Sequence, residues 1–266
     1  MIDLHCHSGH SGDAEGTIAD ICEHAIQKGM QTVAITDHYD FFSTCKEIDF
    51  TCDFAAIRRE IETCRARYDG RIELLYGAEL GQCHADPALT RRVIGDEPFD
   101  VKIGSLHSIP GGDDFYYWDF SAIEPDDFFR QYLAELLRLA QYGQFHILAH
   151  IDYPLRYLRR PGYRPSLIPY LEWLTPVFET IIRRDIALEI NAKALGSWLQ
   201  DVGPEAEVLA HYRRLGGRLI TLGSDSHTPE TVGQGLAQCA ARARQAGFTE
   251  ICSFVKGQVR LHPLEG

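Results

Sequence analysis

The sequence has little positive charge and no long hydrophobic run. It carries 26 lysine and arginine residues against 38 aspartate and glutamate residues, for a formal net charge of −12 at pH 7. A protein that coats nucleic acid needs a basic face, so this balance argues against long nucleic acids as partners. No apolar stretch approaches the ~20 residues that span a bilayer, and no basic, apolar and small-residue pattern opens the chain. We therefore expect a cytoplasmic protein with no membrane partner.

Paired cysteines of the C-x-x-C type are absent, although the chain contains eight cysteines. Nothing in the sequence points to secretion, so we expect reduced thiols rather than disulfides or a zinc ribbon. Gly-x-Ser-x-Gly, Walker and GxGxxG motifs are absent as well. These absences leave no support for a serine-hydrolase elbow, a P-loop or a dinucleotide-binding turn.

What the sequence does contain is an alternation of short apolar runs and helical patterns. Seven runs rich in β-branched residues, each bounded by turn signals, predict strands at 2–5, 32–37, 72–79, 101–107, 147–150, 187–191 and 219–225. Apolar residues at helical spacing predict helices at 17–28, 53–68, 125–142, 166–184, 204–215 and 229–246. Such alternation implies a parallel sheet, which seven or eight right-handed crossovers would close into an α/β barrel.

Three segments lie outside this alternation. Residues 108–124 and 155–164 are rich in glycine, proline or aromatic residues and are expected to be long loops. Long loops in a compact domain are usually functional or mobile. The tail at 251–261 has weak strand character and is expected to pack on the outside.

Six of the seven predicted strands end in residue types that bind metals. These residues are His5 and His7, Asp37 and His38, Glu79, His107, His150, and Asp225 with His227. In an extended chain, residues two apart point to the same face, so the imidazoles of His5 and His7 converge. Barrel active sites lie at the carboxyl ends of the strands, where side chains from distant segments meet.

Each of these residues also has an ordinary structural explanation. Asp37 and Asp225 are suited to capping a following helix, and His107 and His150 to lying hydrogen-bonded in a core. Their shared position at strand ends favours a metal site instead. Imidazoles and carboxylates without thiolates suit zinc, iron or manganese. The ligands exceed what one ion needs, so we expect two or three divalent ions, and ions about 3.5–4 Å apart can share a hydroxide nucleophile.

Motifs in a fixed order resemble those of a known group of enzymes. They are Asp3-Leu4-His5-Cys6-His7, Thr36-Asp37-His38, Gly77-Ala78-Glu79-Leu80, Gly104-Ser105-Leu106-His107, Ala149-His150 and Gly223-Ser224-Asp225-Ser226-His227. As a set they resemble the polymerase-and-histidinol-phosphatase (PHP) superfamily over nearly the whole chain. Within that superfamily, Asp37-His38-Tyr39-Asp40-Phe41, Glu79-Leu80-Gly81-Gln82 and Asp114-Phe115-Tyr116 with Trp118-Asp119 are most similar to stand-alone histidinol-phosphatase-like proteins.

The resemblance implies a distorted (β/α)7 barrel forming one PHP-type, metal-dependent phosphoesterase domain over residues 1–266. It implies a trinuclear site with Glu79, Asp225 and His227 as catalytic residues. One ion would be held by His5, His7, Glu79 and Asp225, a second by Glu79, His107 and His150, and a third by Asp13, His38 and His227. Many relatives carry histidine where this chain has Asp13. Asp37 is expected to orient the adjacent chain or an imidazole.

The implied reaction is hydrolysis of L-histidinol phosphate to L-histidinol and phosphate by a metal-bridging hydroxide. Arg156 matches an arginine that contacts substrate phosphate in such relatives, although a surface position in a basic loop with Arg159 and Arg160 is the alternative. A second phosphate-binding arginine is expected where this chain has Gly196. Lys193 is placed to supply a charge there, but without bidentate geometry.

Two other functions stay open at this stage. One is a PHP-type nuclease or nucleotide phosphoesterase that acts on short nucleic acids or nucleoside phosphates. The other is a catalytically inactive metal-binding or regulatory module, against which the complete set of ligands argues. The sequence makes no prediction of oligomeric state.

Overall fold

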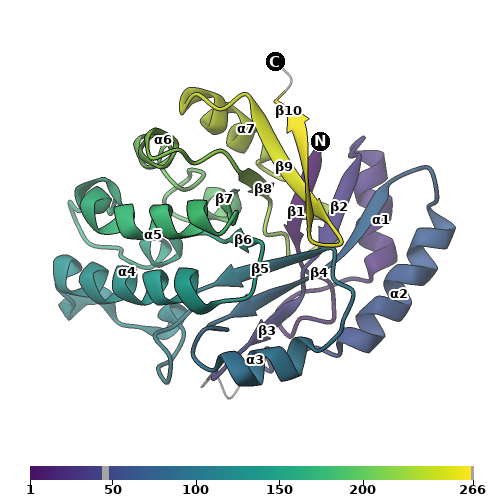
Figure 1. The fold of residues 1–266 in the computed structure, drawn as a ribbon, viewed down its shortest axis with the longest axis horizontal. Helices are drawn as coiled ribbons and strands as arrows, with labels where there is room; N and C mark the ends of the chain where they lie inside the picture. Colours follow the sequence, from purple (N-terminus) through teal and green to yellow (C-terminus); the bar gives the residue numbers. More distant parts are fainter. Residues whose placement is uncertain (44–47, 265–266) are drawn as a thin grey trace.

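A parallel sheet that is nearly closed into a barrel forms the centre of the computed structural model, which describes residues 1–43 and 48–264 (Figure 1). The seven main strands follow the order β1-β2-β4-β5-β6-β7-β8. They are β1 (Ile2–Cys6), β2 (Thr32–Ile35), β4 (Glu73–Gly81), β5 (Val101–Ser105), β6 (Ile147–Leu148), β7 (Ala187–Asn191) and β8 (Ile220–Gly223). The expected distorted (β/α)7 barrel in a single domain is confirmed.

The barrel closes between β1 and β8 beyond the regular part of the ladder. The Asp225 amide donates to the His5 carbonyl at 2.8 Å, and the His7 amide donates to the Ser226 carbonyl at 2.8 Å. These bonds replace a full ladder at this seam, which is why the barrel is distorted. They also bring the first and last predicted metal-ligand motifs against each other.

Helices cover the outside of the sheet, and the strands are therefore buried on both faces. They are α1 (Ile18–Gln27), α2 (Phe54–Arg67), α3 (Pro87–Ile94), α4 (Pro125–Tyr142), α5 (Leu171–Arg183), α6 (Ala206–Arg214) and α7 (Leu236–Gln245). Thr17 and Asp20 form a capping box at the start of α1, as the sequence predicts. In Figure 1, α4 and α5 lie side by side over one flank of the barrel.

Several boundaries differ from the sequence prediction. The strand predicted at 32–37 is split, because pairing with β4 resumes in a separate strand, β3 (His38–Asp40). Helix α3 was not predicted, although Asp86 caps it and Pro87 occupies its first turn. The helix predicted from residue 229 begins only at Leu236, since Gly233 and Gly235 adopt positive φ angles.

The carboxyl-terminal tail forms an antiparallel hairpin of β9 (Glu250–Val255) and β10 (Gln258–Pro263). Lys256 and Gly257 connect the strands with φ angles of 51° and 71°, the signs that a type I′ turn requires. Strand β9 packs beside β8, while β10 lies on the outside near the amino terminus (Figure 1). The weak strand signal in this tail therefore marks a true hairpin.

The predicted long loops contain only short helical turns. Residues 108–124 include 3₁₀ turns at Phe115–Tyr117 and Phe120–Ala122, and a third turn at Tyr153–Arg156 leads into 155–164. Within the described residues, no helix is both long and apolar enough to cross a membrane. The seven described cysteines are free thiols, and Cys45 lies outside the described residues.

Candidate active site

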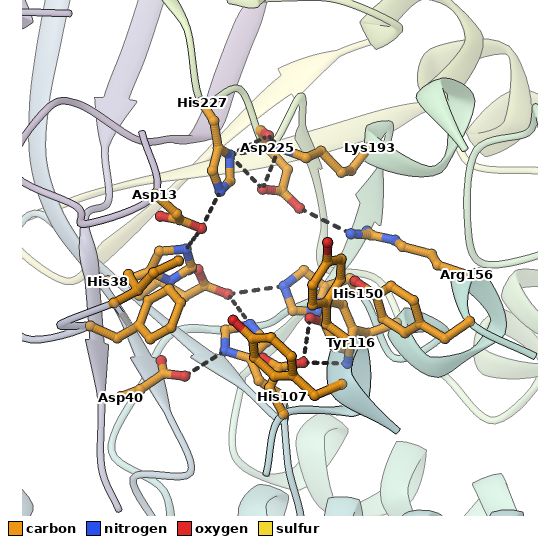
Figure 2. A pocket seen from close by; sticks show the side chains of 17 residues that line it. Asp13, His38, Asp40, His107, Tyr116, His150, Arg156, Lys193, Asp225 and His227 are labelled. Carbon is orange, nitrogen blue, oxygen red and sulfur yellow. Dashed lines mark hydrogen bonds and ion pairs between the residues drawn. The ribbon is translucent and has the colours of Figure 1, made fainter. Parts of the chain in front are cut away.

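The structure brings all nine predicted metal ligands together at the carboxyl end of the barrel, the usual place for a barrel active site (Figure 2). Asp13 comes from the loop before α1, and His38 opens β3 just beyond the carboxyl end of β2. The others lie near or just beyond the carboxyl ends of β1, β4, β5, β6 and β8. They are His5, His7, Asp13, His38, Glu79, His107, His150, Asp225 and His227.

Glu79 lies at the centre of this cluster and is fully buried. Its Oε1 lies 2.9 Å from Nε2 of His150 and 3.2 Å from Nε2 of His107. Its Oε2 lies 3.3 Å from Nε2 of His5 and 3.5 Å from Nε2 of His7. Nδ1 of His38 lies nearer to Oε2, at 2.9 Å. The two oxygens therefore face different groups of imidazoles, as a carboxylate does when it bridges two ions.

Asp225 faces the same cluster from the end of β8. Its Oδ1 lies 3.6 Å from Nε2 of His7 and 3.5 Å from Nδ1 of His227. The residue has a φ of 55°, a left-handed conformation that is uncommon for a side chain other than glycine. Backbone strain of this kind is often found at functional sites, and here it accompanies a carboxylate placed between two imidazoles.

Asp13, His38 and His227 form a third group beside Glu79. Asp13 Oδ2 lies 3.2 Å from Nε2 of His227 and 3.7 Å from Nε2 of His38. The other ring nitrogen of His38, Nδ1, lies 2.9 Å from Glu79 Oε2. His38 thus stands between the central carboxylate and the Asp13 group, so the three groups form one continuous cluster.

Five polar atoms in this cluster are buried without a hydrogen-bond partner among the described residues. They are Nε2 of His5, Nε2 of His7, Nδ1 of His38, Nδ1 of His150 and Oε2 of Glu79. Each unsatisfied buried polar group costs about 1–3 kcal/mol, so five in one place need an explanation. Sets of three ligand atoms within 4.8 Å of one another include His5–His7–Asp225, His38–Glu79–His107 and His7–His38–His227. This donor set fits divalent metal ions.

The charges in the cluster also suit metal binding. Burial raises the pKa of the Glu79 carboxyl, but the surrounding imidazoles, led by His5, outweigh it and hold that pKa well below its usual range. Burial likewise opposes ionisation of Asp225, and the Lys193 ammonium leads the groups that keep its pKa low. Burial lowers the pKa of His7. Both carboxylates are therefore ionised, and His7 is neutral with a free lone pair.

Two carboxylates that were not predicted as site residues orient the imidazoles. Glu189, on β7, lies with Oε1 2.6 Å from Nδ1 of His5, and its Oε2 accepts the backbone amide of His150 at 2.9 Å. Asp40 Oδ2 lies 2.9 Å from Nδ1 of His107. Each carboxylate fixes the ring so that Nε2 faces Glu79, which is the usual support for a metal-binding histidine. A signal existed for Glu189, since it is a charged residue inside the buried strand 187–191.

Asp37 lies behind the cluster, where the sequence analysis expects a supporting role. Its Oδ1 accepts the Ser8 amide at 2.7 Å and the Ser11 hydroxyl at 2.8 Å. The Ser11 hydroxyl lies 3.4 Å from Nδ1 of His7. Asp37 thus contacts the segment after β1 and reaches an imidazole only through Ser11.

Arg156 borders the cluster and is not a surface residue, so the alternative interpretation of a basic surface loop is wrong. Its side chain is 8% exposed, and Nη1 lies 3.6 Å from Oδ2 of Asp225. Nη2 donates to Oδ1 of Asn191 at 2.9 Å, and the guanidinium lies over the Tyr153 ring at 5.2 Å. These contacts hold a positive charge at the edge of the ligand cluster (Figure 2).

Lys193 reaches the same edge from the turn after β7. Its Nζ lies 2.7 Å from Nδ1 of His227 and donates to the Asp225 carbonyl at 2.9 Å. A Cβ added at Gly196 would meet nothing within 4 Å, so the position where a second arginine was expected faces open space. Lys193, rather than Gly196, supplies the second positive charge at this site.

A cavity of about 580 Å³ opens over the cluster, within the range of small-molecule sites. Metal-ligand residues, Arg156 and Lys193 form one part of its wall. The remaining wall is largely aromatic and includes Phe50, Asp114, Tyr116, Tyr117, Tyr153 and Tyr157.

A family model for the PHP domain matches residues 3–193. The chain belongs to the PHP domain family. A histidinol-phosphatase from Lactococcus lactis subsp. lactis (strain IL1403) is 26% identical over 262 residues, covering 95% of this chain and 94% of that protein. A Thermotoga maritima relative, named a probable histidinol-phosphatase, is 27% identical over 248 residues and covers 93% of each chain.

A solved structure extends this similarity to the fold. The crystal structure of histidinol phosphate phosphatase from Lactococcus lactis subsp. lactis Il1403, complexed with zinc, L-histidinol and phosphate, has a TM-score of 0.83 and 25% identity to this chain. The match covers 97% of this chain and 98% of that one. The two proteins therefore share the barrel fold over nearly their whole length.

Proposed function

We propose that this PHP domain protein hydrolyses a small phosphomonoester, with L-histidinol phosphate as the leading substrate. The observation that carries this proposal is the central position of Glu79, whose two oxygens face separate groups of imidazoles, with Arg156 beside Asp225 at the edge of the cluster. The zinc, L-histidinol and phosphate bound by the similar Lactococcus lactis enzyme support it. We propose one metal-dependent phosphoesterase domain over residues 1–266.

The ligand groups support a trinuclear assignment. His5, His7, Glu79 and Asp225 would hold one ion, Glu79, His107 and His150 a second, and Asp13, His38 and His227 a third. Zinc, iron and manganese all accept this set of nitrogen and oxygen donors. When bound, such ions supply Lewis acidity toward phosphoryl oxygens and lower the pKa of water to near neutrality.

Arg156 and Lys193 bind the substrate phosphate in this proposal. The guanidinium of Arg156 is oriented by Asn191 and the Tyr153 ring, so little further ordering is needed when a phosphate oxygen accepts its hydrogen bonds. Nζ of Lys193 lies 2.7 Å from Nδ1 of His227, and Nε2 of that ring faces Asp13 at 3.2 Å. Lys193 thereby lies between the proposed phosphate position and His227, a proposed ligand of the third ion.

Glu79, Asp225 and His227 are the catalytic residues because they touch both the ion positions and the cavity. Glu79 is fully buried and contacts the ligands of both the first and the second ion. Asp225 is in contact with His7 on one side and Arg156 on the other. In this proposal the phosphorus of a bound ester lies between the carboxylates and the two positive side chains.

A substrate panel tests the proposed function. Zinc-reconstituted protein is assayed for phosphate release from L-histidinol phosphate and from nucleoside monophosphates, and for cleavage of short oligonucleotides. We expect kcat/KM for L-histidinol phosphate to exceed that for the others by at least roughly tenfold. Protein carrying Glu79→Gln serves as the control for contaminating phosphatase.

Other results would contradict the proposal. Faster turnover of nucleoside monophosphates or oligonucleotides would assign the site to a PHP-type nucleotide phosphoesterase or nuclease. No phosphate release from any monoester by metal-loaded protein would leave only a metal-binding module.

A further inference from the structure

A second, much smaller cavity lies between the turn that follows β6 and the start of α6. Its volume is about 40 Å³, and among the described residues it shares no lining residue with the active-site cavity. A space of this size holds a water molecule or a single ion, and it is too small for an organic ligand. Three acidic residues line it, Asp152, Asp201 and Glu205. None of them belongs to the predicted metal-binding or phosphate-binding set.

Asp152 has a buried carboxylate oxygen without a partner. The residue is 4% exposed, and no donor among the described residues bonds to its Oδ1. Although Asp152 precedes the turn Tyr153–Arg156, its side chain makes no capping hydrogen bond there. Arg156 directs its guanidinium to Asp225 and Asn191 instead. Neither capping of the turn nor an ion pair with Arg156 therefore explains why this oxygen is buried.

Glu205 has the same features at the start of α6. Its Oε1 accepts the Leu167 amide at 3.2 Å, whereas its Oε2 is buried without a partner among the described residues. Glu205 directly precedes α6, but its side chain does not cap the helix. Burial raises the pKa of the Glu205 carboxyl, and the nearby Asp152 carboxylate raises it further. Two carboxylates that repel each other therefore border one small cavity.

Gly203 allows the two segments to come this close. A Cβ atom at this position would overlap Oδ2 of Asp152, so a residue with a side chain would force the carboxylate away from the backbone. Asp152 thus lies directly against the segment that leads into Glu205, although the two acidic residues are far apart in the sequence. The cavity between them depends on the tertiary fold.

The positive side chains near the cavity do not neutralise these two carboxylates. Arg242 donates to Oδ1 of Asp201 at 2.6 Å. The side chain of Arg164 is 75% exposed, and its Nη2 lies 3.9 Å from Oδ2 of Asp201. Among the described residues, no lysine, arginine or histidine forms an ion pair with Asp152 or Glu205. Buried carboxylates without a counterion are unfavourable, and a bound cation would offset both charges.

We propose that Asp152 and Glu205 bind one hard divalent cation, Ca²⁺ or Mg²⁺, in this cavity. These ions prefer carboxylate oxygens, carbonyl oxygens and water as ligands. No histidine or cysteine is among the described lining residues, so the site does not suit the metals that favour the histidine-rich Glu79 cluster. The ion connects the turn that carries Arg156 to the start of α6. The inference does not depend on the proposed function, and its tests need no substrate.

Calorimetric titration tests the site. The histidine-rich cluster is first filled with zinc and free zinc is removed, and the protein is then titrated with Ca²⁺ or with Mg²⁺. Wild-type protein is expected to bind one further ion per chain below about 1 mM. Glu205→Gln and Asp152→Asn are each expected to weaken this binding by at least roughly tenfold, because each removes a charged ligand. Glu207→Gln, at an exposed position in the first turn of α6, is the matched control and is expected to bind as the wild type does.

Thermal unfolding of the same zinc-loaded proteins gives a second measurement. Without added cation, Glu205→Gln is expected to melt at or above the wild-type temperature, because it removes a buried charge that has no partner. With the tighter-binding cation at about 100 times its dissociation constant, the Tm of the wild type is expected to rise by about 5 °C. The Tm of Glu205→Gln is expected to rise by less than about 1 °C under the same conditions.

Two results would overturn the inference. The first is wild-type protein that binds neither cation up to about 1 mM, a result that needs no variant to fold. The second is binding that is equally strong in the wild type, Glu205→Gln and Asp152→Asn, because the ion would then lie elsewhere.

Discussion

Glu189 and His5, 184 residues apart in sequence, meet at the barrel centre, with Oε1 of Glu189 2.6 Å from Nδ1 of His5. Both side chains are buried. Because Nδ1 is engaged, Nε2 of His5 faces the cluster around Glu79, 3.3 Å from its Oε2. Burial alone lowers the pKa of His5, but Glu189 leads the carboxylates that outweigh it and raise that pKa. A carboxylate on β7 thus decides which nitrogen of His5 is available to a metal.

We predict that Glu189→Gln weakens metal binding by about 10- to 100-fold. Glutamine can replace the oxygen that contacts His5, but its NH₂ group would then face the His150 amide and the Asn191 side-chain amide, which donate to Oε2 in the wild type. Competition of the protein with a zinc-sensitive chelator measures the change. Glu179→Gln, at an exposed site on α5, is the control. Unchanged zinc affinity in a folded Glu189→Gln protein would show that the contact is only structural.

Glu79→Gln is expected to lower turnover by at least ~10²-fold. The substitution removes the negative charge from the centre of the cluster and replaces one carboxylate oxygen with an NH₂ group, which has no lone pair to offer a metal ion. Turnover of the best phosphomonoester is compared at equal metal content, measured by elemental analysis. Near-normal turnover in a folded, metal-loaded variant would remove Glu79 from the bridging position.

Arg156→Ala is expected to lower kcat/KM by about ten- to a hundredfold and to leave metal content unchanged. The guanidinium lies beside Asp225 but completes no ligand group, so its loss affects a bound phosphate more than an ion. Arg159→Ala, in the same loop but exposed, is the matched control. The same kcat/KM in both variants would exclude Arg156 from phosphate binding.

Lys193→Ala tests whether the lysine replaces the arginine expected at Gly196. Its ammonium contacts Nδ1 of His227 and the Asp225 carbonyl, so we expect a loss in kcat/KM comparable to that of Arg156→Ala. Steady-state kinetics with a dianionic phosphomonoester at saturating zinc measures it. An unchanged value would mean that Arg156 alone recognises the phosphate.

The sequence predicted the barrel and the ligand cluster because both depend on local patterns. A ligand-type residue at the end of each parallel strand can be found without knowing the contacts, since the fold brings strand ends together. Glu189 and Asp40 escaped prediction because their roles depend on contacts across 184 and 67 residues. Asp40 does not differ by sequence alone from an ordinary charged residue near a strand end, and the one signal for Glu189 was its charge inside the predicted strand 187–191.

The secondary structure shows the same difference between features that a local pattern predicts and features that depend on distant contacts. Helix α3, only eight residues long, lacked the periodicity of the longer helices, although Asp86-Pro87 was a usable start signal. The break between β2 and β3 depends on the partner strand β4, which pairs with both. No residue pattern in 32–37 indicates this break.

The central claim is that bound metal ions at the Glu79 cluster make this chain a phosphatase. The most direct test is phosphate release from L-histidinol phosphate while metal is removed with a chelator and zinc is then returned stepwise, with bound metal measured in parallel. We predict two or three bound ions per chain in active protein, loss of activity on chelation, and recovery of activity in proportion to the zinc bound. Full activity in chelator from protein with no bound metal would contradict it.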